Sequence, residues 1–70
     1  MEDEILGKDR DALIEAGLPL VKTIAGEYET PGFPLDDLFQ VGCVGLIKAI
    51  DRDTDPAPLV RKEIEAYIRR

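Results

Sequence analysis

Apolar residues recur at spacings of three and four in three stretches of the chain, which predicts three amphipathic helices. The stretches cover residues 11–29, 35–52 and 58–70, and the segments between them are rich in Pro, Gly and Asp. No segment shows the strict alternation that is typical of a strand. The pattern predicts an all-α fold, a compact bundle of three main helices forming one domain over residues 1–70. Residues 1–10 are acidic and weakly patterned, and we expect them to be a frayed leader.

A proline interrupts the first predicted helix. Pro19 has no N–H to donate to the carbonyl of Glu15, and its ring crowds that turn. Gly17 adds backbone freedom beside it. We therefore expect a helix that is kinked, or split in two, near Gly17–Pro19. Its apolar stripe comprises Leu13, Ile14, Leu18, Val21, Ile24, Ala25 and Tyr28.

The second predicted helix is apolar almost all round and contains two glycines. Gly42 and Gly45 each cost about 1 kcal/mol relative to Ala in a helix. A helix keeps such residues where another backbone passes close by, so this helix is predicted to be the centre of the bundle, a docking face, or both. Before it, Thr-Pro-Gly-Phe-Pro at 30–34 predicts a loop with Phe33 as a core plug. After it, Pro58 fits the first turn of the last helix, whose apolar side carries Val60, Ile64, Tyr67 and Ile68.

The charge balance limits the classes of partner. The net charge is −6, from fifteen acidic and nine basic residues, which argues against a protein whose main task is gripping nucleic acid. The lone cysteine, the acidic start without a signal-peptide pattern, and the lack of an apolar run of about 20 residues predict a cytoplasmic protein without a membrane segment. The candidates for a locally basic surface are Lys48, Arg61, Lys62, Arg69 and Arg70.

The sequence offers little for catalysis. It has no histidine, and Cys43 lies within an apolar helix, where a thiolate is disfavoured. Asp53 and Asp55 alternate in a loop, but that loop lacks the glycine and the distal glutamate of an EF-hand, so a solvated acidic loop is the better interpretation. We expect a binding module with no catalytic residues, no metal and no cofactor.

The stretch Leu-Asp-Asp-Leu-Phe-Gln-Val-Gly-Cys-Val-Gly-Leu-Ile-Lys-Ala-Ile-Asp-Arg at 35–52 resembles region 2 of bacterial sigma factors of the sigma-70 superfamily, especially its sporulation and general-stress subgroup. Residues 18–25 and 58–69 resemble the neighbouring helices of that region. The resemblance implies that the 36–52 helix docks on the clamp helices of the largest RNA polymerase subunit. The implied contact residues are Asp37, Gln40, Cys43 and Ile47, whose spacing of three, three and four puts them on one helix face.

Two features complicate this interpretation. Asp37 and Gln40 also have the spacing of a capping box, and Cys43 and Ile47 would suit a core. The family carries an aromatic-rich segment between its last two helices, which stacks on exposed promoter bases. Here the connection is 53–57, which is short, acidic and free of aromatics, and the chain ends at Arg70 before the family's later domain. We therefore expect a protein that does not melt promoter DNA alone.

Several functions remain open on the sequence. The first is a sigma-like transcription protein that docks on RNA polymerase, with DNA binding weak or confined to the complex. The second is a decoy for an anti-sigma regulator. The third is a small DNA-binding protein of a mobile element that uses the last helix, and the fourth is a homodimer formed through the glycine-bearing helix. The candidate nucleic-acid contacts are Arg61, Lys62, Arg69 and Arg70.

Overall fold

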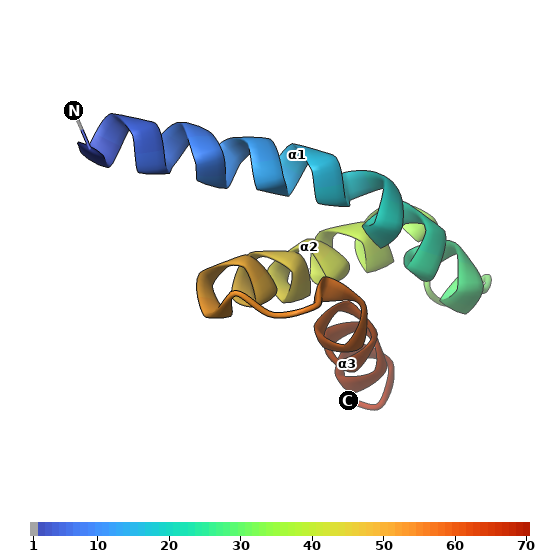
Figure 1. The fold of residues 1–70 in the computed structure, drawn as a ribbon. Helices are drawn as coiled ribbons and strands as arrows, with labels where there is room; N and C mark the ends of the chain where they lie inside the picture. The colour runs from blue at the N-terminus through green and yellow to red at the C-terminus, as the bar shows by residue number, and fades with distance from the viewer. Residues whose placement is uncertain (1) are drawn as a thin grey trace.

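The computed structural model describes residues 2–70, with side chains from Asp9 onward. It contains helices α1 (Glu2–Tyr28), α2 (Leu35–Arg52) and α3 (Pro56–Ile68). Each helix contacts both of the others, and α2 lies between α1 and α3 in Figure 1. Within the described residues no strand occurs, so the prediction of an all-α bundle of three helices is confirmed. None of these helices is long and apolar enough to cross a membrane.

Helix α1 continues through Pro19 without a break. Figure 1 shows that it bends where its colour passes from blue to teal. The kink predicted near Gly17–Pro19 is therefore present as a bend, and the alternative of two separate helices is wrong. The helix also begins at Glu2, nine residues before the predicted start, because the polar residues there lack an apolar stripe to mark them as helical. Most of the side chains of residues 1–10 lie outside the described part of the structure. The expectation that these residues form a frayed leader therefore stays a prediction.

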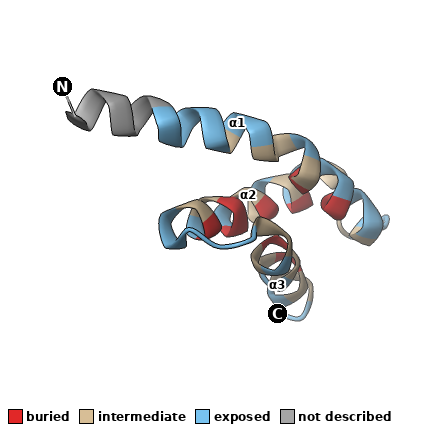
Figure 2. Ribbon diagram, in the orientation of Figure 1, coloured by how far each residue is buried: buried red, intermediate tan, exposed pale blue. Residues whose placement is uncertain are grey.

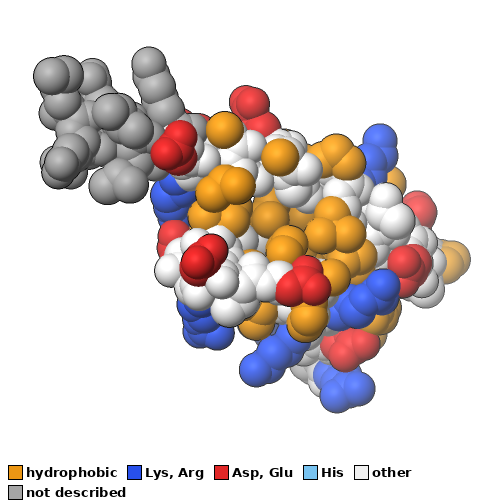
Figure 3. All heavy atoms as spheres, in the orientation of Figure 1, with side chains coloured by type: hydrophobic (Ala, Val, Ile, Leu, Met, Phe, Trp, Pro, Cys, Tyr) orange, Lys and Arg blue, Asp and Glu red, His pale blue; other side chains and the backbone are white. Residues whose placement is uncertain are grey.

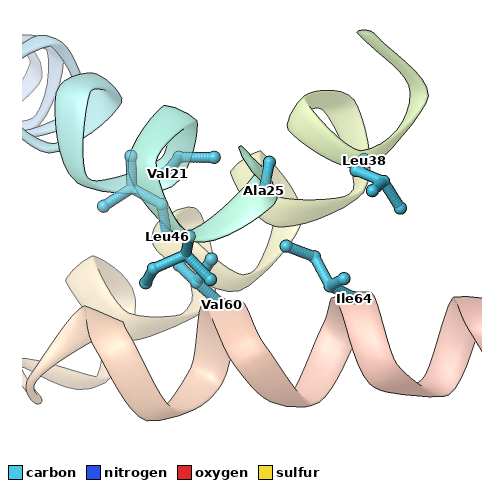
Figure 4. Close-up of a cluster of buried hydrophobic side chains, with 7 residues drawn as sticks. Val21, Ala25, Leu38, Leu46, Val60 and Ile64 are labelled. Carbon is cyan, nitrogen blue, oxygen red and sulfur yellow. The ribbon is translucent and has the colours of Figure 1, made fainter. Parts of the chain in front are cut away.

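The core lies where the second half of α1 meets the other two helices (Figures 2 and 4). Leu13 departs from the predicted stripe, because it is 55% exposed. Residues 9–13 are all exposed, and among the described side chains of α1 the first that the bundle partly covers is Ile14 (Figure 2). The buried apolar side chains are Val21, Ile24 and Ala25 of α1, Leu38, Leu46 and Ala49 of α2, and Val60 and Ile64 of α3.

The two glycines of α2 lie where α2 crosses the other helices. This agrees with the prediction that a helix keeps such unfavourable residues where another part of the chain passes close by. A Cβ atom on Gly45 would lie 2.5 Å from the carbonyl oxygen of Leu59 in α3. A Cβ atom on Gly42 would lie 2.8 Å from Cγ1 of Val21 in α1. Helices of the same chain therefore occupy the glycine-bearing face, and a homodimer through it would require α3 to leave.

The loop between α1 and α2 is a tight turn. Thr30 and Phe33 exchange backbone hydrogen bonds of 3.2 and 3.0 Å. The half-buried Phe33 ring packs edge-to-face on Tyr67 of α3, with centroids 5.7 Å apart and planes at 74°. This contact confirms the prediction that Phe33 plugs the core beneath the loop.

Helix α3 begins two residues earlier than predicted. Asp55 is its N-cap, and the Asp55 carboxylate accepts a hydrogen bond of 3.2 Å from the backbone N–H of Ala57. Pro56, and not Pro58, therefore occupies the first helical position, where its missing N–H costs nothing. As a result the connection between α2 and α3 comprises only residues 53–55.

Candidate docking face

The start of α2 tests the capping-box interpretation of Asp37 and Gln40. The helix begins at Leu35, with Pro34 as an N-cap that makes no side-chain hydrogen bond. Asp36 and Asp37 both lie in the first turn, where their charges favour the positive end of the helix dipole. Because Asp37 is inside the helix and not its cap, the capping-box interpretation is wrong. Both Asp37 and Gln40 are exposed.

Of the four residues expected to dock, Asp37, Gln40 and Ile47 lie on the side of α2 that faces away from the core, and Cys43 lies at its border, where it packs against the core cluster. The buried side of this helix carries Leu38, Gly42, Gly45, Leu46 and Ala49. At 100° per residue, the expected docking residues lie on the opposite half of the helix. Cys43 and Ile47 are half-buried, whereas their neighbours in the core are almost fully covered. The α2 outer face, as we call this surface, comprises Asp37, Gln40, Cys43, Val44 and Ile47.

Val44 is the member of the α2 outer face that the sequence interpretation missed. It is 46% exposed and, with Leu13, is one of two large apolar side chains that are exposed in the described part of the chain. The available signal was its spacing, since Val44 follows Gln40 by four residues and precedes Ile47 by three. Together with Ile47 and Cys43 it gives the surface an apolar centre beside two polar residues.

Cys43 adds an apolar contact and not a reactive group. The thiol is free and partly buried, and burial raises its pKa above the ordinary value. It is therefore protonated near neutral pH, as the sequence predicted. Among the described residues, no group of three or more Cys, Asp and Glu side chains could hold a metal ion.

Two of the candidate basic residues are engaged in ion pairs between helices. Arg61 Nη1 lies 2.7 Å from Oε1 of Glu27 in α1. This hydrogen bond raises the pKa of Arg61 and lowers that of Glu27. Lys48 of α2 pairs with Glu63 of α3. A phosphate that approached Arg61 would have to share it with Glu27, so this side chain is a poorer nucleic-acid candidate than the sequence implied.

The other three candidates lie along α3 and at its end. Lys62, Arg69 and Arg70 are exposed, and no ion pair among the described side chains involves them. Arg69 also caps the helix C-terminus, where a positive charge is favourable. The structure therefore leaves three candidate cations, Lys62, Arg69 and Arg70, without an ion-pair partner among the described side chains.

The connection after α2 is a tightly bonded turn. The N–H of Asp53 donates to the carbonyl of Ile50 at 3.2 Å, and that of Thr54 donates to the carbonyl of Ala49 at 2.9 Å. These two bonds form a Schellman motif, with Asp53 in the left-handed region at φ 54°, ψ 48°. Asp55 then caps α3, so each residue of the connection has a structural role and none is aromatic.

Both tyrosines take part in packing between helices. Tyr28 Oη donates a hydrogen bond of 2.6 Å to Oε2 of Glu65. That bond, together with burial, raises the pKa of Tyr28. Tyr67 packs on Phe33 across the turn that precedes α2. The prediction that both tyrosines belong to the apolar stripes is confirmed, because both are half-buried against the core.

A family model matches most of the chain. It is the model of sigma-70 region 2, and the match covers residues 13–69, which include the second half of α1 and all of α2 and α3. The chain belongs to the sigma-70 region 2 family. This finding confirms the resemblance that residues 35–52 carry, and the matched part contains the whole α2 outer face.

Curated relatives place the chain near sporulation sigma factors. It is 37% identical to the RNA polymerase sigma-F factor of Bacillus licheniformis over 89% of this chain and 28% of that protein. It is 44% identical to the sigma-F factor of Kitasatospora aureofaciens over 86% of this chain and 23% of that protein. The chain thus spans about a quarter of the length of these sigma factors. No solved structure gives a significant match.

The alignment with another relative fits a shortened sigma-70 region 2. The match to the RNA polymerase sigma-G factor of Bacillus subtilis runs over 78 positions at 35% identity, covering 99% of this chain and 30% of that protein. Because this chain has only 70 residues, at least eight aligned positions have no counterpart in it. The three-residue connection between α2 and α3 is consistent with such a shortening.

Proposed function

We propose that this protein is a sigma-factor-like transcription protein of the cytoplasm. It docks on the clamp helices of the largest RNA polymerase subunit through the α2 outer face, and it does not open promoter DNA alone. The role is one of binding and not of catalysis. The observation that carries the proposal is that α2 lies wholly within the sigma-70 region 2 match while Asp37, Gln40 and Val44 of its outer face are exposed.

The composition of the α2 outer face supports docking on a protein. Val44 and Ile47 offer apolar area at its centre, and Asp37 and Gln40 offer an acceptor and an amide at its edge. Protein interfaces commonly combine an apolar centre with a polar rim. None of these five side chains makes a hydrogen bond within the described part of the molecule, so a partner can use their polar groups.

The connection between α2 and α3 supports the second half of the proposal. Stacking on separated DNA strands uses exposed aromatic rings. The three residues 53–55 include no aromatic side chain, and Tyr28 and Tyr67 are committed to contacts with Glu65 and Phe33. We infer that DNA contact, if made through Lys62, Arg69 and Arg70, is weak and depends on the polymerase.

A binding measurement tests the docking. The full chain is titrated against a purified fragment that contains the polymerase clamp helices, and binding is followed by fluorescence anisotropy. We expect a Kd in the micromolar range, and about a tenfold or greater loss for Val44→Asp and Ile47→Asp, since a charge would enter the centre of the interface. Leu13→Asp is the matched control: it also places a carboxylate at an exposed apolar position, but outside the α2 outer face.

The alternatives give different results. The docking proposal would be refuted if the chain, folded as judged by circular dichroism, did not bind the clamp fragment at about 100 μM. The Kd would then exceed about 100 μM, which is far weaker than the expected micromolar value. Binding to an anti-sigma protein and not to the clamp fragment would instead identify a decoy. The claim that the protein does not open promoter DNA alone is tested with promoter DNA that contains 2-aminopurine, whose fluorescence is quenched in the duplex. Polymerase core mixed with this chain is expected to leave the fluorescence quenched, and a rise in fluorescence would show strand opening.

A further inference from the structure

A second apolar surface lies on a different side of the molecule from the α2 outer face. It is a groove of about 330 Å³ between α1 and the C-terminal end of α2. Figure 3 shows hydrophobic side chains gathered between these two elements, with both acidic and basic side chains around them. The main apolar lining residues are Leu13, Ala16 and Leu20 of α1, Leu46 and Ile50 of α2, and Pro56 of α3.

Leu13 makes this groove unusual. It is the most exposed large apolar side chain in the described part of the chain, at 55%. It belongs to the groove wall together with Leu20, so the two side chains mark out a length of seven residues along α1. At about 1.5 Å per residue this is about 10 Å, or two helical turns. The groove is therefore long enough for two apolar anchors of a partner helix.

Acidic side chains lie beside the apolar lining of the groove. Of the carboxylates near the groove, Asp53 is part of its lining, whereas Asp11 and Glu15 are each two residues from Leu13 and, at about 100° per residue, lie on the opposite side of α1. Arg10 is already paired with Asp51, with Nε 3.1 Å from Oδ1. Asp9 precedes Leu13 by one turn. The carboxylate of Asp55 caps α3, so Asp53 and Asp9 are the acidic side chains that remain for a ligand beside the apolar lining.

We propose that this groove binds a basic amphipathic helix of a partner protein. Apolar side chains at positions i and i+3 or i+4, and at i+7, would enter between Leu13 and Ile50, as in other helix-in-groove complexes. Flanking Lys or Arg residues would meet the carboxylates of Asp53 and Asp9. A second copy of this chain fits poorly, because it is acidic and the apolar face of its α3 is already used in its core.

Selection from a peptide library tests the proposal directly. The full chain is used to select from a displayed library of helical peptides with Leu or Ile fixed at i, i+3, i+4 and i+7 and with all other positions randomised. The selected peptides are then synthesised, and their Kd is measured by fluorescence anisotropy. We expect Lys and Arg to be enriched at the randomised positions, and binding to weaken as salt rises.

Matched variants locate the binding surface. Leu13→Asp should weaken binding of the selected peptides by about tenfold or more, whereas Val44→Asp, at the other exposed large apolar side chain in the described part of the chain, should leave their binding unchanged. Asp53→Asn removes one charge and should weaken binding by about threefold at low salt. This pattern is the reverse of the one expected for polymerase docking, so the two proposals fail independently.

Three results would overturn the proposal. The first is a library that yields no peptide beyond the background of an unrelated acidic protein. The second is a set of peptides with acidic or neutral flanks, or peptides whose Kd is indifferent to Leu13→Asp. The third is self-association in analytical ultracentrifugation that Leu13→Asp abolishes, which would show that a second copy covers the groove.

Discussion

Gly45 of α2 and Leu59 of α3 lie so close together that no side chain fits between them. A Cβ atom on Gly45 would sit 2.5 Å from the Leu59 carbonyl oxygen and 2.7 Å from the Cα atom of Val60. Both of these atoms belong to the backbone of α3, so a larger residue at position 45 cannot be accommodated by a rotamer change. This contact fixes the distance at which α3 crosses α2.

Gly45→Ala should therefore destabilise the protein even though Ala is the better helix former. Overpacking against a rigid neighbour costs about 1–3 kcal/mol, which exceeds the gain of about 1 kcal/mol in helix propensity. Gly26→Ala is the control, because a Cβ atom there meets nothing within 4 Å, and it should stabilise by about 0.5–1 kcal/mol. Urea unfolding followed by circular dichroism measures both; an equal gain for the two variants would contradict the close approach.

Asp53 gives a second stability test. It holds φ 54° at the C-terminus of α2, where a side chain is strained and a negative charge is unfavourable. Asp53→Gly should raise the free energy of unfolding by about 1 kcal/mol, and Asp53→Asn by less, since only the charge changes. Asp53→Ala keeps the strain and loses the polar side chain that tolerates this conformation, so it should not stabilise. A thermal melt in which Ala and Gly behave alike would argue against the left-handed turn.

The hydrogen bond from Tyr28 to Glu65 predicts a dependence of stability on alkaline pH. Because this bond and burial raise the pKa of the phenol above its ordinary value of about 10, the neutral form is favoured in the folded state. The contribution of the neutral phenol to the free energy of unfolding is complete below pH 10, and it is lost as the pH rises through the folded-state pKa of Tyr28. Tyr28→Phe should cost about 1 kcal/mol at neutral pH and show a smaller loss above pH 10. Urea titrations of the wild type and of Tyr28→Phe at pH 7 and 10.5 measure this difference. If the bond were absent, the two proteins would lose the same free energy of unfolding between these pH values.

Gly17 and Leu46 should be coupled energetically. A Cβ atom on Gly17 would lie 2.5 Å from Cδ1 of Leu46, which is the tip of a flexible side chain. Leu46→Ala removes a fully buried side chain and should cost about 2–5 kcal/mol. In the Leu46→Ala background, the methyl group of Gly17→Ala can occupy the space that Leu46 vacates. The free energy of unfolding of the double variant should therefore be about 1 kcal/mol higher than the value obtained by adding the effects of the two single substitutions. Strict additivity would show that the two positions do not touch.

The sequence predicted α2 closely and the ends of the other helices less well. The predicted bounds of 35–52 are those observed, because Pro34 and the helix-ending turn at Asp53 stand directly outside a long apolar run. The start of α3 was missed by two residues, since Pro56 and Pro58 both suit a first turn. Only the hydrogen bond from Ala57 to Asp55 selects Pro56.

The surfaces show a further limit of sequence interpretation. Helical spacing groups Asp37, Gln40, Cys43 and Ile47 within one half of α2, because that depends on α2 alone. It could not show that Arg61 pairs with Glu27, or that Leu13 lies beyond the cover of the bundle. Both facts depend on how α1 lies against the other helices, and the pattern within one helix does not determine its tertiary partners.

The three-residue turn between α2 and α3 also has a consequence for how the chain folds. Joining two helices through so few residues costs little loop-closure entropy, and Gly45 and Leu59 are closer in sequence than Gly42 and its α1 neighbour Val21. Contacts at shorter sequence separation form faster. The α2–α3 hairpin should therefore assemble first during folding, and α1 should dock onto it afterwards through the longer turn at 29–34.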